Sequence, residues 1–428
     1  MVLIEPGSYM DNNNDPKAVR PIVFLMHGLL SSSADWVIMG PGSAFGYLLA
    51  EAGYDVWMGN ARGNYYSRKH VSLNPDSLFN TAFWAFSWDE IGNLDLPTMI
   101  DYALALTGQK RLHYVGHSQG TTSFFVMTSL RPDYNEKIIS MHAFAPVAYM
   151  AHNKNPLLMV TMDVFLSQMI TSLLGIGEFL PNTMINQWAG EALCRDQVVT
   201  QALCSNILYL VGGWNECQHN ATMMPAIFGH APAGAAVRQF AHYGQGIAGK
   251  EFRRYDQGSN IANWRKYGSF TPPRYDLAKI TTPVFLHYSD MDPLAEVPDV
   301  DRLFRELGRP IGKFRVSMTT FSHLDFLWGI DAKELLYDRT LNLIRDKNRL
   351  LYILITRSKV RYLLHNNATS LHMELNPRWE TQHGTNVGSQ QTTTSMHSLT
   401  YYWTEFNPTL LYIFLRHSYF IPVSCIRK

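Results

Sequence analysis

The stretch LHYVGHSQGTTSFFVMTSL, residues 112–130, decides the fold. Its first four residues form a short apolar run typical of a buried strand, and Thr121–Leu130 is compatible with a helix. Between them lies a G-x-S-x-G motif at Gly116–Gly120. A sharp turn there would hold Ser118 Oγ at the top of a sheet, with glycine on both sides because a Cβ would collide with the folded backbone. The strand, turn and helix order favours a nucleophilic serine over an ordinary glycine turn.

A nucleophilic serine of this kind needs an acid and a histidine, which follow it in that order after later strands. Residues 283–288 read as a strand and are followed by Asp290 and Asp292, and residues 313–320 read as another strand followed by His323. The histidine would take the proton from the serine and return it to a leaving alcohol, while the acid holds the imidazole tautomer. Spacing alone leaves both aspartates open as the acid.

The chain also offers an oxyanion hole, which requires two backbone N–H groups aimed at one oxygen. Ile22–Met26 is an apolar strand candidate that ends in His-Gly-Leu-Leu at residues 27–30. The hydrolase arrangement predicts the N–H of Leu29 as one donor and that of Gln119, directly after the serine, as the other. Without Ser118, the same segment would read as a simple strand end with a glycine turn.

Several segments resemble the animal acid lipase family, which includes gastric and lysosomal acid lipases and many insect members. The similarity extends over most of the chain, from about Pro21 to Arg345. The segments are FLMHGLLSSSADW at 24–36, GNARGNYYSRKH at 59–70, FSWDEIG at 86–92 with DLP at 95–97, GHSQGTT at 116–122 and HLDF at 323–326.

The resemblance implies an α/β-hydrolase fold, with a mostly parallel sheet, helices on both faces and an inserted, mainly helical cap. It implies Ser118 as nucleophile, His323 as base and Asp292 as acid, because Asp292 precedes a Leu-Ala-x-x-x-Asp-Val pattern at residues 294–300. It also carries the oxyanion role onto Leu29 and Gln119. The implied activity is a serine lipase or esterase that cleaves acyl esters of glycerol or sterols through an acyl-enzyme, with no metal or other cofactor.

Two alternatives stay open. A thioesterase or an esterase of small esters would share every catalytic residue, and a lipid-binding protein could keep the pocket without turnover. The complete set of Ser118, Asp292 and His323 argues against the second, because a binding protein needs none of these residues together.

Composition agrees with a large hydrolase. The formal net charge is +1 and only 17% of residues are charged, so the chain as a whole has no basic field for nucleic acid or an anionic membrane. A length of 428 residues accommodates one hydrolase domain with a cap, and an aromatic content of 13% suits an apolar core and an acyl site. The expected partner is a lipid ester at an interface, and the apolar runs near the C-terminus are too short for a transmembrane segment.

We expect the chain to divide into a core, an inserted cap and a tail. Residues 156–175 are apolar and rich in methionine, which suggests an amphipathic helix at the mouth of the site. The resemblance implies a lid near residues 181–212. The expected divisions are 1–147 for the first part of the core, 148–272 for the cap, 273–346 for the second part of the core and 347–428 for a tail outside the family pattern.

Three of the four cysteines and one sequon lie in the expected cap. The resemblance implies a disulfide between Cys194 and Cys204, and Cys217 is expected to stay free. Asn220-Ala-Thr is a glycosylation acceptor if the chain enters the secretory route. The family implies a secreted or lysosomal protein.

The two ends depart from the family pattern. Only twenty residues precede Pro21, and Met1–Gly7 has neither the charged nor the apolar region of a signal peptide. The early strands of the family are therefore expected to be missing, which would leave a sheet edge exposed. We expect the tail to be unnecessary for assembling the site.

Overall fold

In the computed structural model of the chain, the structure describes residues 2–4, 20–77, 81–153, 155, 158, 177–181, 212–213 and 215–348. Nearly all of the expected amphipathic helix and of the expected lid lies outside these residues. The expected Cys194–Cys204 disulfide and the tail beyond residue 348 also lie outside them.

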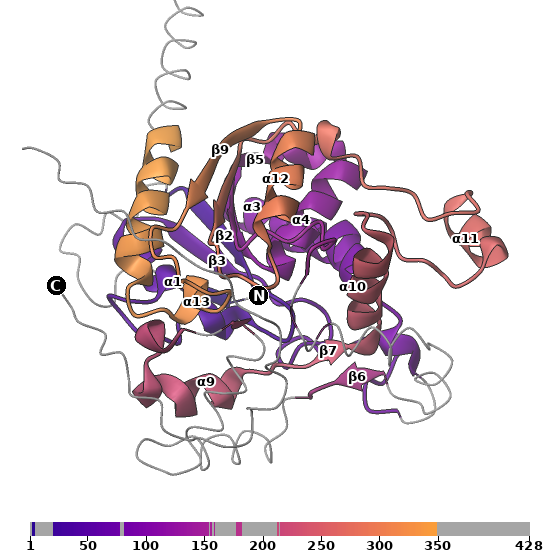
Figure 1. Cartoon of the computed structure of the whole chain (residues 1–428), viewed down its shortest axis with the longest axis horizontal. Helices are drawn as coiled ribbons and strands as arrows, with labels where there is room; N and C mark the ends of the chain where they lie inside the picture. The colour runs from indigo at the N-terminus through magenta and orange to yellow at the C-terminus, as the bar shows by residue number, and fades with distance from the viewer. Residues whose placement is uncertain are drawn as a thin grey trace, which may run out of the picture. The chain divides into compact units, whose positions relative to one another are not determined.

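A seven-stranded sheet forms the centre of the described structure (Figure 1). Neighbouring strands are parallel except for the first pair, which is antiparallel. In spatial order the strands are β1 (Val2–Ile4), β3 (Asp55–Met58), β2 (Ile22–Met26), β4 (Leu112–His117), β5 (Ile138–Phe144), β8 (Val284–Tyr288) and β9 (Pro310–Arg315).

Helices cover both faces of this sheet, as expected for parallel strands joined by crossovers (Figure 1). The helices of the core are α1 (Phe45–Glu51), α2 (Trp88–Glu90), α3 (Leu96–Thr107), α4 (Gln119–Leu130), α12 (Val297–Glu306), α13 (Asp325–Trp328) and a last helix over 338–348, with π-helical turns at Ile91–Asp95 and Lys333–Tyr337. The predicted cap region contains α9 (Met224–His230), α10 (Val237–Gly249), α11 (Asn260–Tyr267) and a small antiparallel pair, β6 (Glu178–Phe179) with β7 (Ala235–Ala236).

The core is divided into two apolar layers by the sheet. Successive side chains of a strand point to opposite faces, so Ile22, Phe24 and Met26 of β2 join one layer and Val23 and Leu25 join the other. All five are at most 1% exposed. The whole strand is therefore buried on both faces, and it reads in sequence as one continuous apolar run.

The predicted strand at 22–26 has the bounds that the sequence suggested. The last strand was misplaced: it was expected at 313–320, but β9 spans Pro310–Arg315. Proline and Gly312 argue against a strand in sequence, yet an edge strand tolerates both. After Arg315 the chain leaves the sheet and forms the loop that carries His323.

The sheet edge at β3 is covered, contrary to the expectation that it would be exposed. Residues Val2–Ile4 form β1, which pairs antiparallel with Val56–Met58 of β3. The sequence of the first residues is apolar and β-forming over only three positions, too short to predict a strand without its partner.

Cys217 is disulfide-bonded, so the expectation that it stays free is wrong. The other three cysteines lie outside the described residues. Cysteine spacing does not determine connectivity, which explains the error.

None of the described helices is long and apolar enough to cross a bilayer.

A first testable prediction follows from the packing of α4 against β2. A Cβ on Gly120 would lie 2.2 Å from the carbonyl oxygen of Met26, whereas a Cβ on Gly229 of α9 would meet nothing within 4 Å. Gly120→Ala should therefore lower the free energy of unfolding by about 3 kcal/mol or more, since backbone atoms must move. Gly229→Ala should be neutral or slightly stabilising. Urea unfolding of both variants checks this, and equal effects would contradict the described packing.

Candidate active site

Ser118 occupies the turn between β4 and α4 in a strained conformation. Its φ is +53° and its ψ is −119°, values that residues other than glycine rarely adopt. The Ser118 N–H donates to the carbonyl of Phe144 on the neighbouring strand at 3.0 Å. Such strain costs on the order of 1–3 kcal/mol and persists only where the surroundings enforce it. It lies at the residue that the sequence marks as the nucleophile.

The two glycines of the motif are needed for the reason that the sequence suggested. A Cβ on Gly116 would lie 2.7 Å from the carbonyl carbon of Gly120. A Cβ on Gly120 would in turn collide with the backbone of β2 at Met26 and His27. The turn thus folds onto itself and onto the neighbouring strand at the same time.

The structure brings Asp292 to His323 and leaves Asp290 apart. The Asp292 carboxylate oxygens lie 2.8 and 2.9 Å from His323 Nδ1, and both side chains are buried. Asp290, by contrast, is exposed and pairs with Arg315. The geometry therefore distinguishes two aspartates that spacing alone could not separate.

Asp292 is held in its charged form. Burial by itself would raise the pKa of this carboxyl, but attraction to His323 and its hydrogen bonds outweigh burial and hold the pKa below its usual range. Two of those bonds come from the backbone N–H groups of Leu294 and Ala295, each at 2.9 Å. Because a carboxylate can only accept hydrogen bonds, His323 Nδ1 donates to Asp292, which leaves Nε2 as the ring nitrogen available to another partner.

The backbone of His323 is fixed on both sides of its side chain. Its N–H donates to the carbonyl of Gly212 at 2.9 Å, and its carbonyl accepts from His117 Nε2 at 2.9 Å. Burial, together with the neighbouring His323, lowers the pKa of His117 to about 3, so the ring is neutral with its proton on Nε2. The sequence analysis assigned no role to His117, although it lies within the quoted motif.

The predicted oxyanion segment lies beside the serine. A Cβ on Gly28 would be 3.6 Å from Ser118 Oγ, so the strand end of β2 and the turn are adjacent. In the described part of the chain, neither the Leu29 N–H nor the Gln119 N–H has a hydrogen-bond partner. No hydrogen bond joins Ser118 Oγ to His323 Nε2 among these residues, a bond that in hydrolases often tightens only with substrate.

A buried polar network holds the oxyanion segment in place. His27 Nε2 accepts from the Ala61 N–H at 3.1 Å and lies 3.2 Å from Asn64 Nδ2. Asn60 bonds the same segment through Ser33, whose N–H donates to Asn60 Oδ1 at 3.0 Å. Burial lowers the pKa of His27 to about 4 and keeps its ring neutral. Two loops that follow neighbouring parallel strands are thereby joined.

Two further carboxyls lie behind these loops, and the sequence analysis did not identify either. Asp325 accepts from the Ser322 N–H at 2.6 Å and from Asn215 Nδ2 at 2.7 Å, which ties the histidine loop to the segment around Asn215. Burial raises its pKa to about 6. Asp35 accepts from Ser31 Oγ, and burial raises its pKa to about 7. In the sequence, the only indication of a role for either residue was its position within a segment that resembles the acid lipase family.

Metal binding is a separate question. Among the residues that the structure describes, no group of three or more His, Cys, Asp or Glu side chains is arranged to hold a metal ion.

The buried carboxyl of Asp35 predicts a pH effect on stability. Its pKa is about 7 in the fold and 3.8 in an ordinary exposed aspartate, so the unfolded chain releases this proton first as pH rises. Its contribution to stability is present below pH 3.8 and is lost as pH rises to about 7. The free energy of unfolding of wild type should therefore fall by roughly 3–4 kcal/mol over that range. Asp35→Asn cannot ionise, so this variant should not show the fall.

Urea unfolding of wild type and Asp35→Asn at several pH values measures this difference. Asp133→Asn, at an exposed position, serves as the control and should follow wild type. Parallel pH profiles for wild type and Asp35→Asn would show that this carboxyl ionises normally in the fold.

The comparisons with known proteins agree with this geometry. Residues 21–330 match the model of the α/β hydrolase fold family. Among solved structures, a putative lipase from Sulfolobus solfataricus superposes with a TM-score of 0.52 at 12% identity, covering 77% of this chain and 86% of that chain, which supports the fold alone.

Curated relatives are much more similar in sequence. Lipase 1 of Drosophila melanogaster is 42% identical over 345 residues, which cover 80% of this chain and 75% of the relative. Human lysosomal acid lipase/cholesteryl ester hydrolase is 38% identical, with coverage of 78% and 82%, and rat gastric triacylglycerol lipase is 37% identical, with coverage of 78% and 83%. The chain therefore belongs to the family of gastric, lysosomal acid and insect lipases, within the α/β-hydrolase fold.

Proposed function

We propose that this protein is a serine lipase that hydrolyses carboxylic esters of lipids, with Ser118, His323 and Asp292 as its catalytic triad. The buried His323–Asp292 pair beside the strained Ser118 is the observation that carries the proposal. Burying a charged carboxylate costs free energy that its partners must offset, and such perturbed groups are concentrated at functional sites. Here the pair leaves His323 Nε2 free to act as a base.

The proposed reaction follows from these positions. His323 Nε2 takes the proton of Ser118 Oγ as the oxygen attacks the ester carbonyl, and Asp292 stabilises the imidazolium that forms. The carbonyl oxygen becomes negative and accepts hydrogen bonds from the N–H groups of Leu29 and Gln119. His323 then protonates the leaving alcohol, and a water molecule, activated by the same imidazole, hydrolyses the acyl-enzyme.

The substrate class rests on the relatives. One is named a gastric triacylglycerol lipase and another a lysosomal acid lipase/cholesteryl ester hydrolase, so triacylglycerols and cholesteryl esters are the proposed substrates. A thioesterase or small-ester esterase would use the same residues and is tested by the same panel of substrates. A lipid-binding protein without turnover is the third possibility that the panel addresses.

A secretory route fits the cysteine chemistry of the described residues. Cys217 is disulfide-bonded, and disulfides persist mainly in oxidising compartments. Asn220 lies in a sequon at the start of a short helical turn, where its Oδ1 accepts from Thr222. We infer a secreted or lysosomal protein with Asn220 as a glycosylation site, in line with the locations that the names of gastric and lysosomal relatives suggest.

The triad predicts strong and non-additive losses of activity. Ser118→Ala and His323→Ala should each lower kcat by at least about a thousandfold, and the double variant should lose little more, because the residues act as a unit. Hydrolysis of a triacylglycerol, a cholesteryl ester and a short soluble ester measures this, alongside labelling of the serine by a fluorophosphonate. Wild type that binds these lipids but neither turns over nor labels would favour the lipid-binding alternative.

The two neighbouring aspartates give a matched pair of variants. Asp292→Asn should lower kcat by about ten-thousandfold, because the amide favours the wrong tautomer of His323. Asp290→Asn removes only an exposed ion pair with Arg315 and should change kcat by less than about twofold. Steady-state kinetics on a soluble ester distinguishes them, and the opposite ranking would reassign the acid.

A further inference from the structure

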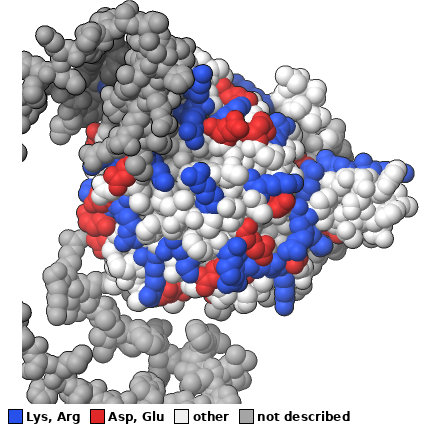
Figure 2. Space-filling model, turned by 90° about the horizontal axis from the view of Figure 1, so that it is seen from above, with Lys and Arg blue, Asp and Glu red and all other residues white. Residues whose placement is uncertain are grey.

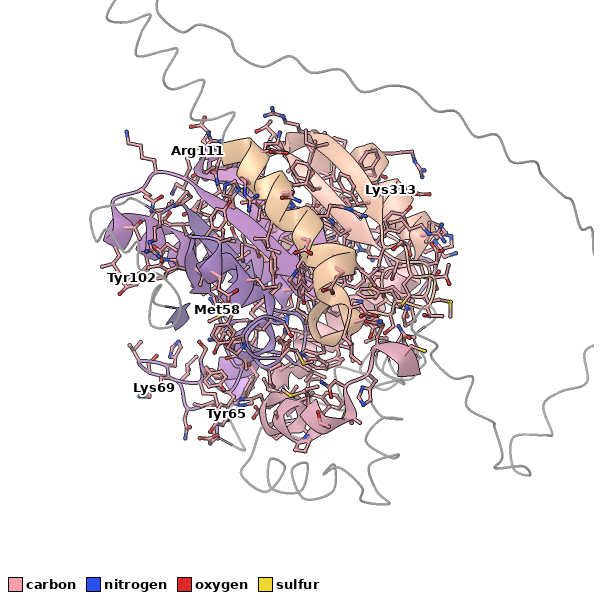
Figure 3. The ribbon with its side chains drawn as sticks, turned by 90° about the vertical axis from the view of Figure 1, so that its left-hand side faces the viewer. Met58, Tyr65, Lys69, Tyr102, Arg111 and Lys313 are labelled. Atoms are coloured by element: carbon pink, nitrogen blue, oxygen red, sulfur yellow. The ribbon has the colours of Figure 1, made fainter. Side chains whose placement is uncertain are left out.

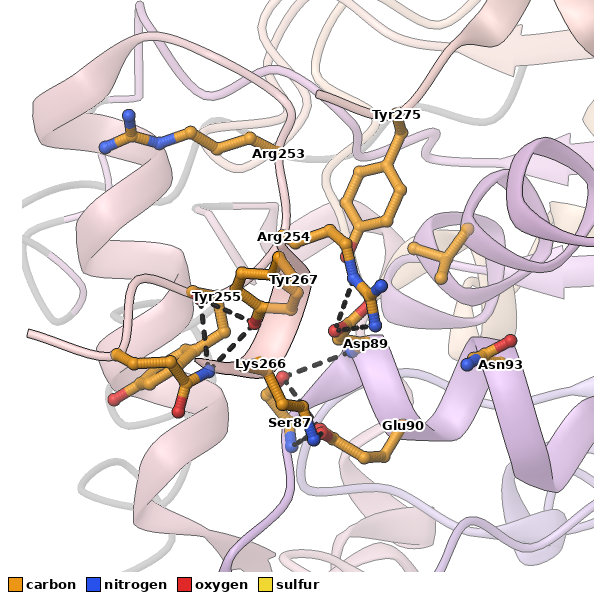
Figure 4. Close-up of polar contacts among 12 residues, drawn as sticks. Ser87, Asp89, Glu90, Asn93, Arg253, Arg254, Tyr255, Lys266, Tyr267 and Tyr275 are labelled. Atoms are coloured by element: carbon orange, nitrogen blue, oxygen red, sulfur yellow. Dashed lines mark hydrogen bonds and ion pairs between the residues drawn. The ribbon is translucent and has the colours of Figure 1, made fainter. Parts of the chain in front are cut away.

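An arm carrying α11 projects from the body of the molecule (Figure 1). Two antiparallel stems support it: Arg253 and Arg274 form a β-bridge, and the Arg254 N–H donates to the carbonyl of Pro273 at 2.9 Å. The side chain of Arg254 pairs with Asp89 of the core, which is 1% exposed (Figure 4). The arm is therefore a built element with a buried ionic anchor.

The side of α11 that faces the stems is polar. Asn263 is 2% exposed; its Oδ1 accepts from the Gln257 N–H at 2.9 Å, and its Nδ2 donates to Asp256 at 3.0 Å. One turn later, Tyr267 donates its hydroxyl to the carbonyl of Tyr255 at 2.7 Å (Figure 4). These two positions, four residues apart, lie on one face of the helix.

The outward side of the arm is apolar, the reverse of an ordinary surface helix. Ile261 is 64% exposed and Trp264 is 55% exposed, and they are three residues apart on one face. Phe270, which follows the helix, is 61% exposed. Single exposed apolar residues need no explanation, but three large ones on a projecting element mark an interaction surface.

The charge of the arm favours an anionic partner. Residues 257–275 contain no aspartate or glutamate, and they include Arg265, Lys266 and Arg274. Lys266 lies 3.8 Å from Glu90 and Arg274 pairs with Glu251, but Arg265 has no ion pair among the described residues. In the view from above, the projection on the right is mainly uncharged with basic residues along its edge (Figure 2).

We propose that the exposed apolar side chains of this arm, Ile261, Trp264 and Phe270, with Arg265 next to Trp264 in the chain, insert into the surface of a phospholipid-coated lipid phase. Aromatic and aliphatic side chains flanked by a cation are the composition that binds at the boundary between headgroups and acyl chains. The inference deepens the proposed function, on which it rests, by naming the surface that holds the enzyme on its insoluble substrate. The net charge of the whole chain does not indicate this site, because acidic residues elsewhere balance the positive charges of the arm.

The test uses vesicles and a protein that cannot consume them. In a Ser118→Ala background, Ile261→Ser, Trp264→Ser and Phe270→Ser are combined, and cosedimentation is measured with phosphatidylcholine vesicles with and without phosphatidylglycerol. The matched control combines Tyr102→Ser and Leu106→Ser on α3, which are 57% and 64% exposed (Figure 3). Arg265→Ser is measured separately.

The triple variant should partition at least about tenfold more weakly, because binding scales with the apolar area inserted. The α3 control should change partitioning by less than about twofold, and Arg265→Ser should weaken only the binding to anionic vesicles. With Ser118 restored, the triple variant should hydrolyse a soluble ester at the wild-type rate and a lipid emulsion more slowly.

Three results would overturn the proposal. Unchanged vesicle binding by the triple variant would do so, and so would an equal loss in the α3 control. A dimer of wild type that dissociates in the triple variant would instead assign the arm to a second copy of the chain. Inactivity of wild type on every ester would sink only the proposed function, because vesicle binding is measured in the Ser118→Ala protein.

Discussion

The close approach of α4 to the end of β2 is the constraint on which the rest of the active-site region depends. The backbone at Gly120 lies so near the carbonyl of Met26 that no side chain fits between them. This contact sets the sharp turn, and the turn imposes the positive φ of Ser118. The same contact brings the end of β2, with Gly28, alongside the serine. The proposed nucleophile and the expected oxyanion donors are therefore positioned by one packing interaction.

The histidine loop is fixed by a different principle, the satisfaction of buried polar groups. His323 comes from a loop after the edge strand β9, where the sheet itself offers little support. His117 and Gly212 hold its backbone, and Asp292 holds its ring. Each of these partners is buried, so losing one leaves a polar group without compensation. These contacts fix the position of the loop, although it has no regular secondary structure.

Burial produces opposite effects on the acids and the histidines around the site. It raises the pKa of Asp35 and Asp325 toward neutrality, and it lowers the pKa of His27 and His117 into the acid range. Asp292 is different, because His323 and two backbone N–H groups outweigh its desolvation. Between about pH 4 and about pH 6, the site would therefore keep the charge on Asp292 while Asp35, Asp325, His27 and His117 stay neutral. The charge is concentrated where the proposed reaction uses it.

Sequence by itself determined the elements whose signal is local. The apolar run of β2, the glycines around Ser118 and the order of serine, aspartate and histidine all follow from covalent geometry and strand periodicity. Spacing alone could not choose Asp292 over Asp290, although the family resemblance favoured Asp292. The sequence also did not identify His117 and Asp325 as supports or place β1 and β9 correctly, because each depends on atoms far away in the chain. The exposure of the apolar residues around Trp264 could not be predicted either. The sequence pattern of an amphipathic helix is the same whichever of its faces is buried. Only the tertiary structure decides which face meets water, because burial is a property of the whole fold.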